Sequence, residues 1–332
     1  MKKAGEIVDL IKSSKKIVIT SHRSPDGDSI GSSLGLFRFI QKMGIDADVC
    51  HPDPAPNFLK WVSKGVNIIN FQESKEEVKE KLLSADLIFC LDYNDPFRIG
   101  REMGELLIES KAKKIMIDHH PNPSDFVDIS VSEPSVCSTA QLIYELIDSS
   151  GNLDLLDSVI GTPVYLGIMT DTGSFRYSNV TSRTHVVISE LLRSGVNQSL
   201  VHESTFDNMP INRLKLRGYA MSEKIELLVN YPIAIMSLNE EELKRFSYIK
   251  GDTEGLVNIA LAVEGVEMAA FFVEKDGVVK ISFRSKGDLV VNELASDNFE
   301  GGGHVNAAGG ISRIGLAETI EKFKNALPKY YS

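Results

Sequence analysis

The chain has 332 residues, of which 42% are hydrophobic and 25% charged, the composition of a soluble globular protein with room for two domains. Its formal net charge of -10 argues against binding to long duplex nucleic acid, because such binding needs a basic surface. Three widely spaced cysteines without a C-x-x-C pair suit a reducing compartment, and no apolar run is long enough for a membrane span. We therefore expect a cytoplasmic protein without a membrane partner.

The first part of the chain alternates between two kinds of pattern. An amphipathic helix is predicted at the N-terminus, where Glu6, Asp9 and Lys12 interrupt the apolar stretches. Beyond it, β-rich runs predict strands at 15–20, 46–50, 67–70, 86–92 and 113–118, and helical patterns predict helices at 27–44 and 74–84. Such alternation is typical of a mostly parallel α/β sheet. Gly31 and Gly35 would let the helix of 27–44 pack closely on that sheet.

The rest of the chain changes character twice. Residues 137–226 predict helices, and from about residue 230 onward β-rich runs predict a second, smaller α+β domain. The sequence Lys-Asp-Gly between two of these runs predicts a hairpin. The domain ends in the glycine-rich EGGGHVNAAGG and a final helix. The predicted division is a first domain, a helical linker and a second domain, at 1–195, 196–228 and 229–332.

One short stretch, HRSPDGDSIGSSLG, has more charge than a turn requires. It places His22, Asp26 and Asp28 within seven positions, directly after a predicted strand. A calcium-binding EF-hand is excluded, because counting from Asp26 places Ile30 and Phe37 at the fifth and twelfth ligand positions. A dinucleotide-binding fingerprint is excluded too, because the glycines do not form G-x-G-x-x-G. A metal site of imidazole and carboxylate groups remains.

Further acidic and histidine residues follow other predicted elements. They are Asp92 after LIFCL, the triplet Asp118, His119 and His120 after KKIMI, and Asp171 in TDTGSFRYS. Each one alone is explained equally well by a helix cap, a turn or a satisfied polar residue. Taken together, however, several carboxylates at the carboxyl ends of strands would repel one another unless cations neutralise them. The pattern therefore favours a metal centre.

In this order, HRSPDGDSIGS, LDYND, DHHPNP and TDTGSFRYS resemble the four motifs of the DHH phosphoesterases. FRSK and GGGHVNAAGG resemble the DHH-associated C-terminal domain of the branch that degrades nanoRNA. The resemblance covers nearly the whole chain. It implies an α/β fold with an N-terminal parallel-sheet DHH domain, a smaller α+β domain and an active site in the cleft between them.

The resemblance also implies a role for each motif residue. One metal ion would be held by His22 and Asp26, the other by Asp28, His119 and Asp171, and both by Asp92. His120 would act in catalysis by facing the phosphoryl group, and Asp118 would orient a ligand. The implied ions are two Mn²⁺, with Mg²⁺ or Co²⁺ as substitutes, which agrees with oxygen and imidazole donors and no thiolate. Two ions about 3.5–4 Å apart activate a water, so no serine or cysteine nucleophile is required.

The implied substrate is a small nucleotide or a short single-stranded oligonucleotide. The phosphate contacts would come from Arg284, Gly302, Gly303 and His304 in the second domain, and from Arg98 and Arg176 in the first. For Arg98 and Arg176, an ordinary surface role explains the sequence equally well. The substrates would be pApA, pGpG and RNA of two to five residues, with pAp and cyclic di-AMP as further candidates. Base preference and oligomeric state, a homodimer included, stay open.

Two other functions stay open at this point. A family II-like pyrophosphatase or exopolyphosphatase would share the motifs of the first domain but carry a basic C-terminal signature in place of GGGH. A non-catalytic nucleotide-binding sensor would use metal ions only to hold its ligand. His51, His185 and His202 match none of the motifs and are interpreted as structural or surface histidines.

Overall fold

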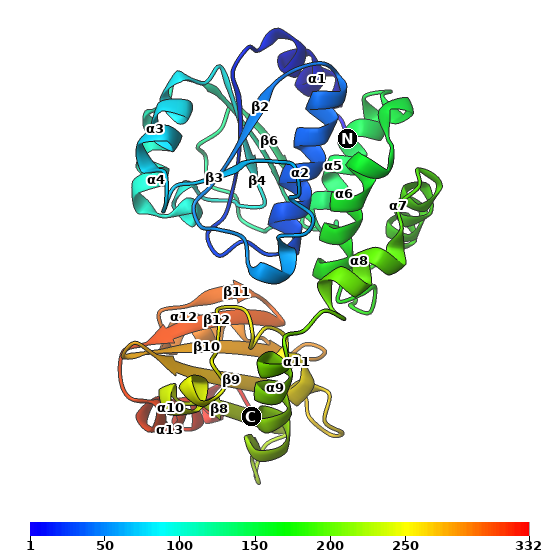
Figure 1. Cartoon of the computed structure of the whole chain (residues 1–332). Coiled ribbons are helices and arrows are strands. Elements are labelled where there is room, and N and C mark those ends of the chain that lie inside the picture. The colour runs from blue at the N-terminus through cyan, green and yellow to red at the C-terminus, as the bar shows by residue number, and fades with distance from the viewer. Residues whose placement is uncertain (332) are drawn as a thin grey trace. The chain divides into compact units, whose positions relative to one another are not determined.

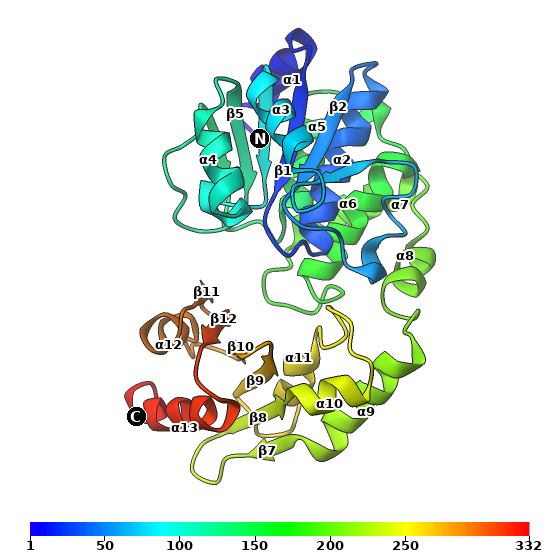
Figure 2. The same ribbon diagram turned by 60° about the vertical axis from the view of Figure 1, so that its left-hand side comes forward.

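The structure is a computed structural model and describes residues 1–331. The chain divides into two units, Met1–Asn208 and Met209–Ser332, each with a six-stranded sheet of its own (Figures 1 and 2). The division falls between helices α8 (Gln198–Thr205) and α9 (Ile211–Glu223), inside the range where the sequence predicts a helical linker.

The sheet of the first unit is entirely parallel, with the strand order β3-β2-β1-β4-β5-β6. Its strands are β1 (Ile17–Ser21), β2 (Ala47–His51), β3 (Ile68–Asn70), β4 (Leu87–Leu91), β5 (Lys113–Asp118) and β6 (Ile129–Ser132). The chain runs outward from β1 in one direction and then returns to β4 on the other side of β1. In an open parallel sheet, ligands bind beside the carboxyl ends of the strands at this switch point. The predicted α/β fold class is confirmed.

Helices cover both faces of this sheet (Figures 1 and 2). One face carries α1 (Ala4–Ser13), α2 (Gly27–Lys42), α5 (Thr139–Ser149) and α6 (Ser158–Asp171), and the other carries α3 (Lys75–Ser84) and α4 (Arg101–Glu109). Every residue of β1 and β4 is buried as a result. This explains why both strands are nearly continuous apolar runs without polar alternation.

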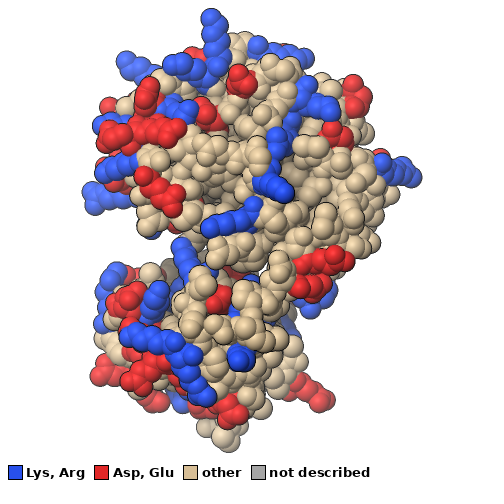
Figure 3. Space-filling view, in the orientation of Figure 1, with Lys and Arg blue, Asp and Glu red and all other residues tan. Residues whose placement is uncertain are grey.

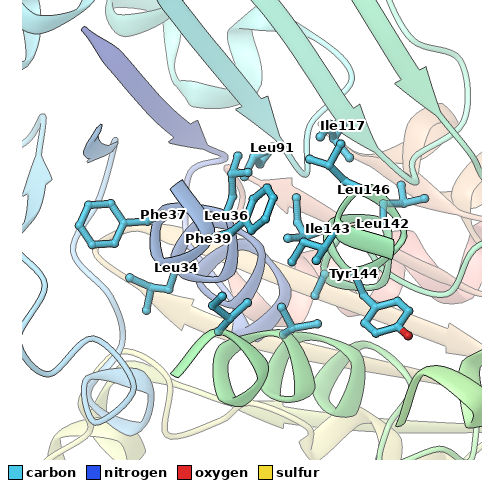
Figure 4. Close-up of a cluster of buried hydrophobic side chains, with 14 of the residues drawn as sticks. Leu34, Leu36, Phe37, Phe39, Leu91, Ile117, Leu142, Ile143, Tyr144 and Leu146 are labelled. Carbon is cyan, nitrogen blue, oxygen red and sulfur yellow. The ribbon is translucent and has the colours of Figure 1, made fainter. Parts of the chain in front are cut away.

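The larger core of the unit lies between α2, α5 and the sheet. Figure 4 shows Leu36 and Phe39 of α2 and Ile143 of α5 close to Leu91 and Ile117, which lie near the carboxyl ends of β4 and β5. All five side chains are fully buried. This apolar packing fixes the start of α2 and of α5 relative to the strand ends.

Gly31 and Gly35 of α2 differ from expectation in their packing partner. A Cβ atom at Gly31 would clash with the backbone of Pro163 and Gly167, and one at Gly35 would clash with Val164. All three neighbours belong to α6, so the glycines let α2 approach another helix and not the sheet. The prediction of close packing on the sheet was wrong, because the sequence pattern does not reveal which layer faces a glycine.

One α-helix and one strand of the first unit have no counterpart among the sequence predictions. Helix α4 and strand β6 both lie in regions to which the sequence assigned no element. Strand β6 has four residues and alternates between buried and less buried positions, because it forms the edge of the sheet. The unit ends with α7 (Ser182–Arg193) and α8, in the region where helices are predicted.

The second unit is built on a mixed sheet with the strand order β11-β12-β10-β9-β8-β7. Its strands are β7 (Ile225–Leu227), β8 (Ile233–Leu238), β9 (Met268–Lys275), β10 (Val278–Ser285), β11 (Gly302–His304) and β12 (Ala307–Ser312). Helices α9, α10 (Glu240–Arg245) and α11 (Leu256–Leu261) pack on one face, and α12 (Asn292–Asn298) and α13 (Leu316–Ala326) on the other. The predicted hairpin joins β9 to β10, with positive φ at both Asp276 (52°) and Gly277 (74°), as its tight turn requires.

Acidic and basic side chains are interspersed on the face of each unit that Figure 3 shows. Across residues 1–331, none of the helices has both the length and the hydropathy of a bilayer-spanning segment.

Candidate metal centre

Neighbouring parallel strands deliver the predicted acidic and histidine residues to one edge of the first sheet. His22 follows β1, Asp92 follows β4, and Asp118 is the last residue of β5. These three strands are adjacent and parallel, so their carboxyl ends lie side by side. The residues therefore meet at the switch point of the sheet.

The first group of side chains consists of His22, Asp26 and Asp92, whose donor atoms lie within 4.8 Å of one another. His22 Nε2 is 3.2 Å from Asp92 Oδ2 and 3.7 Å from Asp26 Oδ2. The other ring nitrogen, Nδ1, is 2.8 Å from the carbonyl oxygen of Arg23. Because a carbonyl can only accept, Nδ1 carries a proton, and Nε2 is the ring nitrogen that faces the carboxylates.

The second group consists of Asp28, His119 and Asp171, again within 4.8 Å. His119 Nε2 is 3.4 Å from Asp171 Oδ2, 3.6 Å from Asp92 Oδ1 and 3.9 Å from Asp28 Oδ2. Its Nδ1 is 3.3 Å from the carbonyl oxygen of Val136, so this imidazole also directs Nε2 at carboxylates.

Asp92 lies between the two groups. Its Oδ2 faces His22, and its Oδ1 faces His119 and His120, with His120 Nδ1 3.8 Å away. The residue has φ +64°, a left-handed backbone that aspartate tolerates better than most residues. This conformation ends β4 abruptly and positions the carboxylate at the strand end.

His120 is held by Asp118. Its Nδ1 donates to Asp118 Oδ1 at 2.7 Å, and Asp118 is fully buried. Burial lowers the pKa of His120, but the hydrogen bond to Asp118 and the charge of Asp92 outweigh it, so the net shift is upward. The protonated ring is therefore favoured. The predicted orienting role of Asp118 remains a prediction, and its observed partner is His120.

The start of helix α2 positions the remaining two carboxylates. Asp26 is the N-cap, and its Oδ1 accepts from the N–H groups of Asp28 and Ser29. Asp28 is in the first turn and almost fully buried, and its two oxygens accept from the N–H groups of Thr139 and Ala140 at 2.7 and 2.8 Å. Each aspartate therefore accepts two hydrogen bonds from backbone N–H groups.

The cluster has strong electrostatic coupling. Burial raises the pKa of Asp28, and the charges of Asp92, Asp171 and Asp26 raise it further. Burial also raises the pKa of Asp92, but the hydrogen bond and charge of His22 outweigh it and the net shift is downward. Burial lowers the pKa of His22, yet Asp26 and Asp92 hold it well above its ordinary value. The shifts of Asp28 and His22 have one cause in common: the neighbouring carboxylates favour a proton, or another cation, in the site.

A divalent cation fits this arrangement of donors. Two imidazoles direct Nε2 at carboxylates, which is stable only when a proton or a cation lies between the groups. The donors are carboxylate oxygens and imidazole nitrogens without a thiolate, a set that suits metals such as Mn²⁺ and Mg²⁺. The acidic and histidine groups of this centre are able to bind metal.

The predicted substrate contacts lie in two places. Arg98 is exposed on a short 3₁₀ turn after Asp92, and its charge acts on His120. Arg176 is exposed, and its Nε donates to the carbonyl oxygen of Gly173 at 2.6 Å. In the second unit, Arg284 of β10 pairs with Ala307 of β12, which in turn pairs with His304 of β11. Gly302 and Gly303 precede His304 on β11 and are exposed.

Two buried residues beside the centre were missed by the sequence analysis. Thr139 Oγ1 donates to Asp92 Oδ1 at 2.9 Å, and Asp53 accepts from the N–H of Ser24 at 2.7 Å. Ser24 has φ +55° and lies in the loop that joins His22 to Asp26, so Asp53 holds that loop. In the sequence, Thr139 reads only as the start of a helix and Asp53 only as part of a proline-rich turn.

Two family models match this chain. The model of the DHH family, N-terminal domain, matches residues 16–168, and the model of the DHHA1 domain matches residues 230–332. The bifunctional oligoribonuclease and PAP phosphatase NrnA of Thermus thermophilus is 31% identical over 312 residues, which are 94% of this chain and 89% of that protein. The chain belongs to the DHH family. The resemblance inferred from the motifs is confirmed.

Two further similar proteins have other names. The cyclic-di-AMP phosphodiesterase GdpP of Bacillus subtilis is 28% identical over 337 residues, which are 97% of this chain but 49% of that protein. A solved structure of an exopolyphosphatase-related protein from Bacteroides fragilis has a TM-score of 0.95 and 38% identity, and covers 99% of this chain and 96% of its own.

Proposed function

We propose that this DHH-family chain is a metal-dependent phosphodiesterase that hydrolyses short nucleotides to mononucleotides. The substrates are pApA, pGpG and RNA of two to five residues, and pAp and cyclic di-AMP are further candidates. One observation carries the proposal. Four carboxylates and the Nε2 atoms of two histidines, which come from five separate segments of the chain, lie together at the switch point of the first sheet. The named activities of the relatives in Thermus thermophilus and Bacillus subtilis support it.

The proposed cofactor is a pair of Mn²⁺ ions, with Mg²⁺ or Co²⁺ as substitutes. His22 and Asp26 would hold one ion, Asp28, His119 and Asp171 the other, and Asp92 both. When bound, such ions lower the pKa of a water nucleophile and neutralise charge on the phosphoryl oxygens.

The protein residues then bind and orient the substrate. Asp118 holds the Nδ1 proton of His120, which makes Nε2 the ring nitrogen that would donate to a phosphoryl oxygen. Burial lowers the pKa of His120, but the hydrogen bond to Asp118 raises it and so favours the cationic ring, in which Nε2 also carries a proton that it can donate to the phosphate. Arg98 and Arg176 would supply further positive charge.

In the second unit, one rung of the sheet forms the proposed contact to a distant phosphate. Arg284, Ala307 and His304 are register partners on adjacent strands, so their side chains lie on the same side of the sheet. Strand β12, with the small side chain of Ala307, lies between Arg284 and His304. The two residues are therefore two strand spacings apart, about 10 Å. Gly302 and Gly303 would leave their backbone N–H groups accessible to the anion.

A product-resolved assay tests the proposal. The chain is incubated with Mn²⁺ and, in parallel, with pApA, pGpG, pAp, cyclic di-AMP and a 24-residue RNA (about five times the proposed upper length), and products are separated by chromatography. We expect mononucleotides from the dinucleotides at a rate well above that for the long RNA. Preferred cleavage of the long RNA, or no turnover of any nucleotide, would contradict the proposal.

A second candidate function has one observation in its favour, the high similarity to the exopolyphosphatase-related protein. Pyrophosphate and a long polyphosphate belong in the same assay for this reason. Release of orthophosphate from either, without cleavage of pApA, would favour that function. Binding of pApA in the presence of Mn²⁺ without any turnover would instead favour a nucleotide-binding sensor.

A further inference from the structure

The start of helix α5 contacts two different carboxylates of the centre. The N–H of Thr139 donates to Asp28 Oδ2 at 2.7 Å, and its hydroxyl donates to Asp92 Oδ1 at 2.9 Å. The next N–H, of Ala140, donates to Asp28 Oδ1 at 2.8 Å. The side chains are deeply buried, with exposed fractions of 0% for Thr139, 1% for Asp28 and 2% for Asp92.

We propose that Thr139 is a positioning residue that couples the two cation positions, by fixing Asp28 through its backbone N–H and Asp92 through its hydroxyl. This inference rests on the proposed function, because it concerns how the centre holds its ions. Thr139 therefore sets the position of Asp28, which belongs to one group of metal-binding side chains, relative to Asp92, which faces both groups. The separation of the two cations is then determined by the rigid start of α5.

The hydroxyl bond of Thr139 is not needed to cap the helix. Ser138 is the N-cap, and its side chain already accepts from the N–H of Gln141. A threonine in a helix commonly donates its hydroxyl to a carbonyl of the preceding turn. Here the hydroxyl instead reaches Asp92, 47 residues away in the sequence. The contact therefore serves the carboxylate and not the helix.

The hydroxyl fixes the plane of the Asp92 carboxylate. The two oxygens of Asp92 face different histidines, with Oδ2 3.2 Å from His22 Nε2 and Oδ1 3.6 Å from His119 Nε2. A carboxylate that is free to rotate would turn both oxygens away from these directions, and its ability to bridge would be lost. Partners that orient a ligand in this way typically contribute about 10- to 100-fold to metal affinity.

Three variants separate the two contacts. Thr139→Val has the same shape and removes only the hydroxyl, and Thr139→Ser restores it. Thr139→Pro removes the N–H as well, and its ring displaces Asp28. Proline is tolerated at the first helical position, and Ser138 is already extended (φ −164°, ψ 156°), as a residue before proline prefers. Ser182→Pro, at the first position of α7, is the matched control for proline itself.

The measurements are calorimetric titration of the metal-free proteins with Mn²⁺ and the rise in melting temperature that Mn²⁺ produces. We expect Thr139→Val to bind Mn²⁺ about 10-fold more weakly than the unchanged chain and to show a smaller rise. Thr139→Ser should recover both quantities, and Ser182→Pro should match the unchanged chain. Thr139→Pro should lose one of the two binding events, because Asp28 belongs to only one group, and should weaken the other as Thr139→Val does, because proline also lacks the hydroxyl.

Three outcomes would overturn the inference. If Thr139→Val melts at a lower temperature without metal but keeps the affinity and the Mn²⁺-induced rise of the unchanged chain, the residue is only structural. If Thr139→Ser fails to recover the affinity, the hydroxyl is not the responsible group. If the unchanged chain binds no Mn²⁺, the proposed function fails together with the inference, which distinguishes that result from the other two.

Discussion

In the first unit the candidate residues come from the ends of strands and of helices that the fold brings together. In the second unit Arg284 and His304 lie on one rung of a single sheet. Asp28, Asp92 and Asp118 are almost fully buried, while His304 is exposed. Burial concentrates negative charge and so creates a demand for cations. The exposed rung of Arg284, Ala307 and His304 does not concentrate negative charge and is suited to binding a phosphate of the substrate.

This difference shows how each site is specified. In the first unit, position depends on tertiary hydrogen bonds, such as those from Thr139 to Asp28 and Asp92. In the second unit, position follows from strand register alone, since Ala307 pairs with both Arg284 and His304. A change in the metal centre of the first unit should therefore weaken metal binding or turnover, and a change in the rung of the second unit should weaken only the binding of substrate.

The largest effect is expected from Asp92→Asn. Asparagine keeps the shape and tolerates the positive φ of this position, so the backbone should remain unchanged. The loss of the charge that faces both groups should reduce the turnover of pApA by at least about 100-fold. Steady-state kinetics with saturating Mn²⁺ measure this. Asp154→Asn, an exposed carboxylate elsewhere in the unit, is the control, and undiminished turnover in Asp92→Asn would refute the bridging role.

A smaller effect is expected from Arg284→Ala in the second unit. Losing one charged hydrogen bond to a phosphate, worth about 1.5–3 kcal/mol, should raise KM for pApA by about 10-fold or more. Affinity for Mn²⁺, measured by calorimetric titration, should stay the same. Lys280→Ala, on the same strand and exposed, is the control. Weakened Mn²⁺ binding in Arg284→Ala would contradict the claim that the second unit contributes to substrate binding and not to metal binding.

The smallest effect concerns pH and His51, which is fully buried in the first unit. Burial lowers the pKa of His51 to about 3, below the value of about 6.5 for an exposed histidine. The folded state therefore holds the neutral ring, and its stabilising contribution is complete above pH ~6.5 and decreases as the pH falls toward 3. The loss amounts to at most about 1.4 kcal/mol per pH unit.

Melting temperatures of the metal-free chain between pH 7.5 and 5 test this expectation. The unchanged protein should lose more stability on acidification than His51→Leu, whose side chain does not titrate. Parallel curves for the unchanged chain and His51→Leu would show that the buried ring is not responsible.

Much of the first unit was predictable, because buried parallel strands are continuous apolar runs. The strand predicted at 113–118 coincides with β5, and the helix predicted at 27–44 differs from α2 only at its end. Strand β6 and helix α4 were missed, because a four-residue edge strand and a short amphipathic segment give little periodic signal.

The site was predictable in part for a similar reason. The meeting of His22, Asp92 and Asp118 followed from the rule that parallel strands end at one edge. The contacts of Thr139 and Asp53 could not be predicted, because each depends on which helix or loop packs beside the strand ends. The sequence also does not reveal the order of the layers. For this reason Gly31 and Gly35 were predicted to pack on the sheet, although their neighbours are in α6.

Diffraction from crystals grown in excess Mn²⁺, with anomalous data collected near the manganese absorption edge, tests the central claim most directly. We expect two anomalous peaks per chain, one beside His22 and Asp26, the other beside Asp28, His119 and Asp171, with Asp92 between them. A single peak, peaks away from these side chains, or none at saturating Mn²⁺ would contradict the two-cation centre.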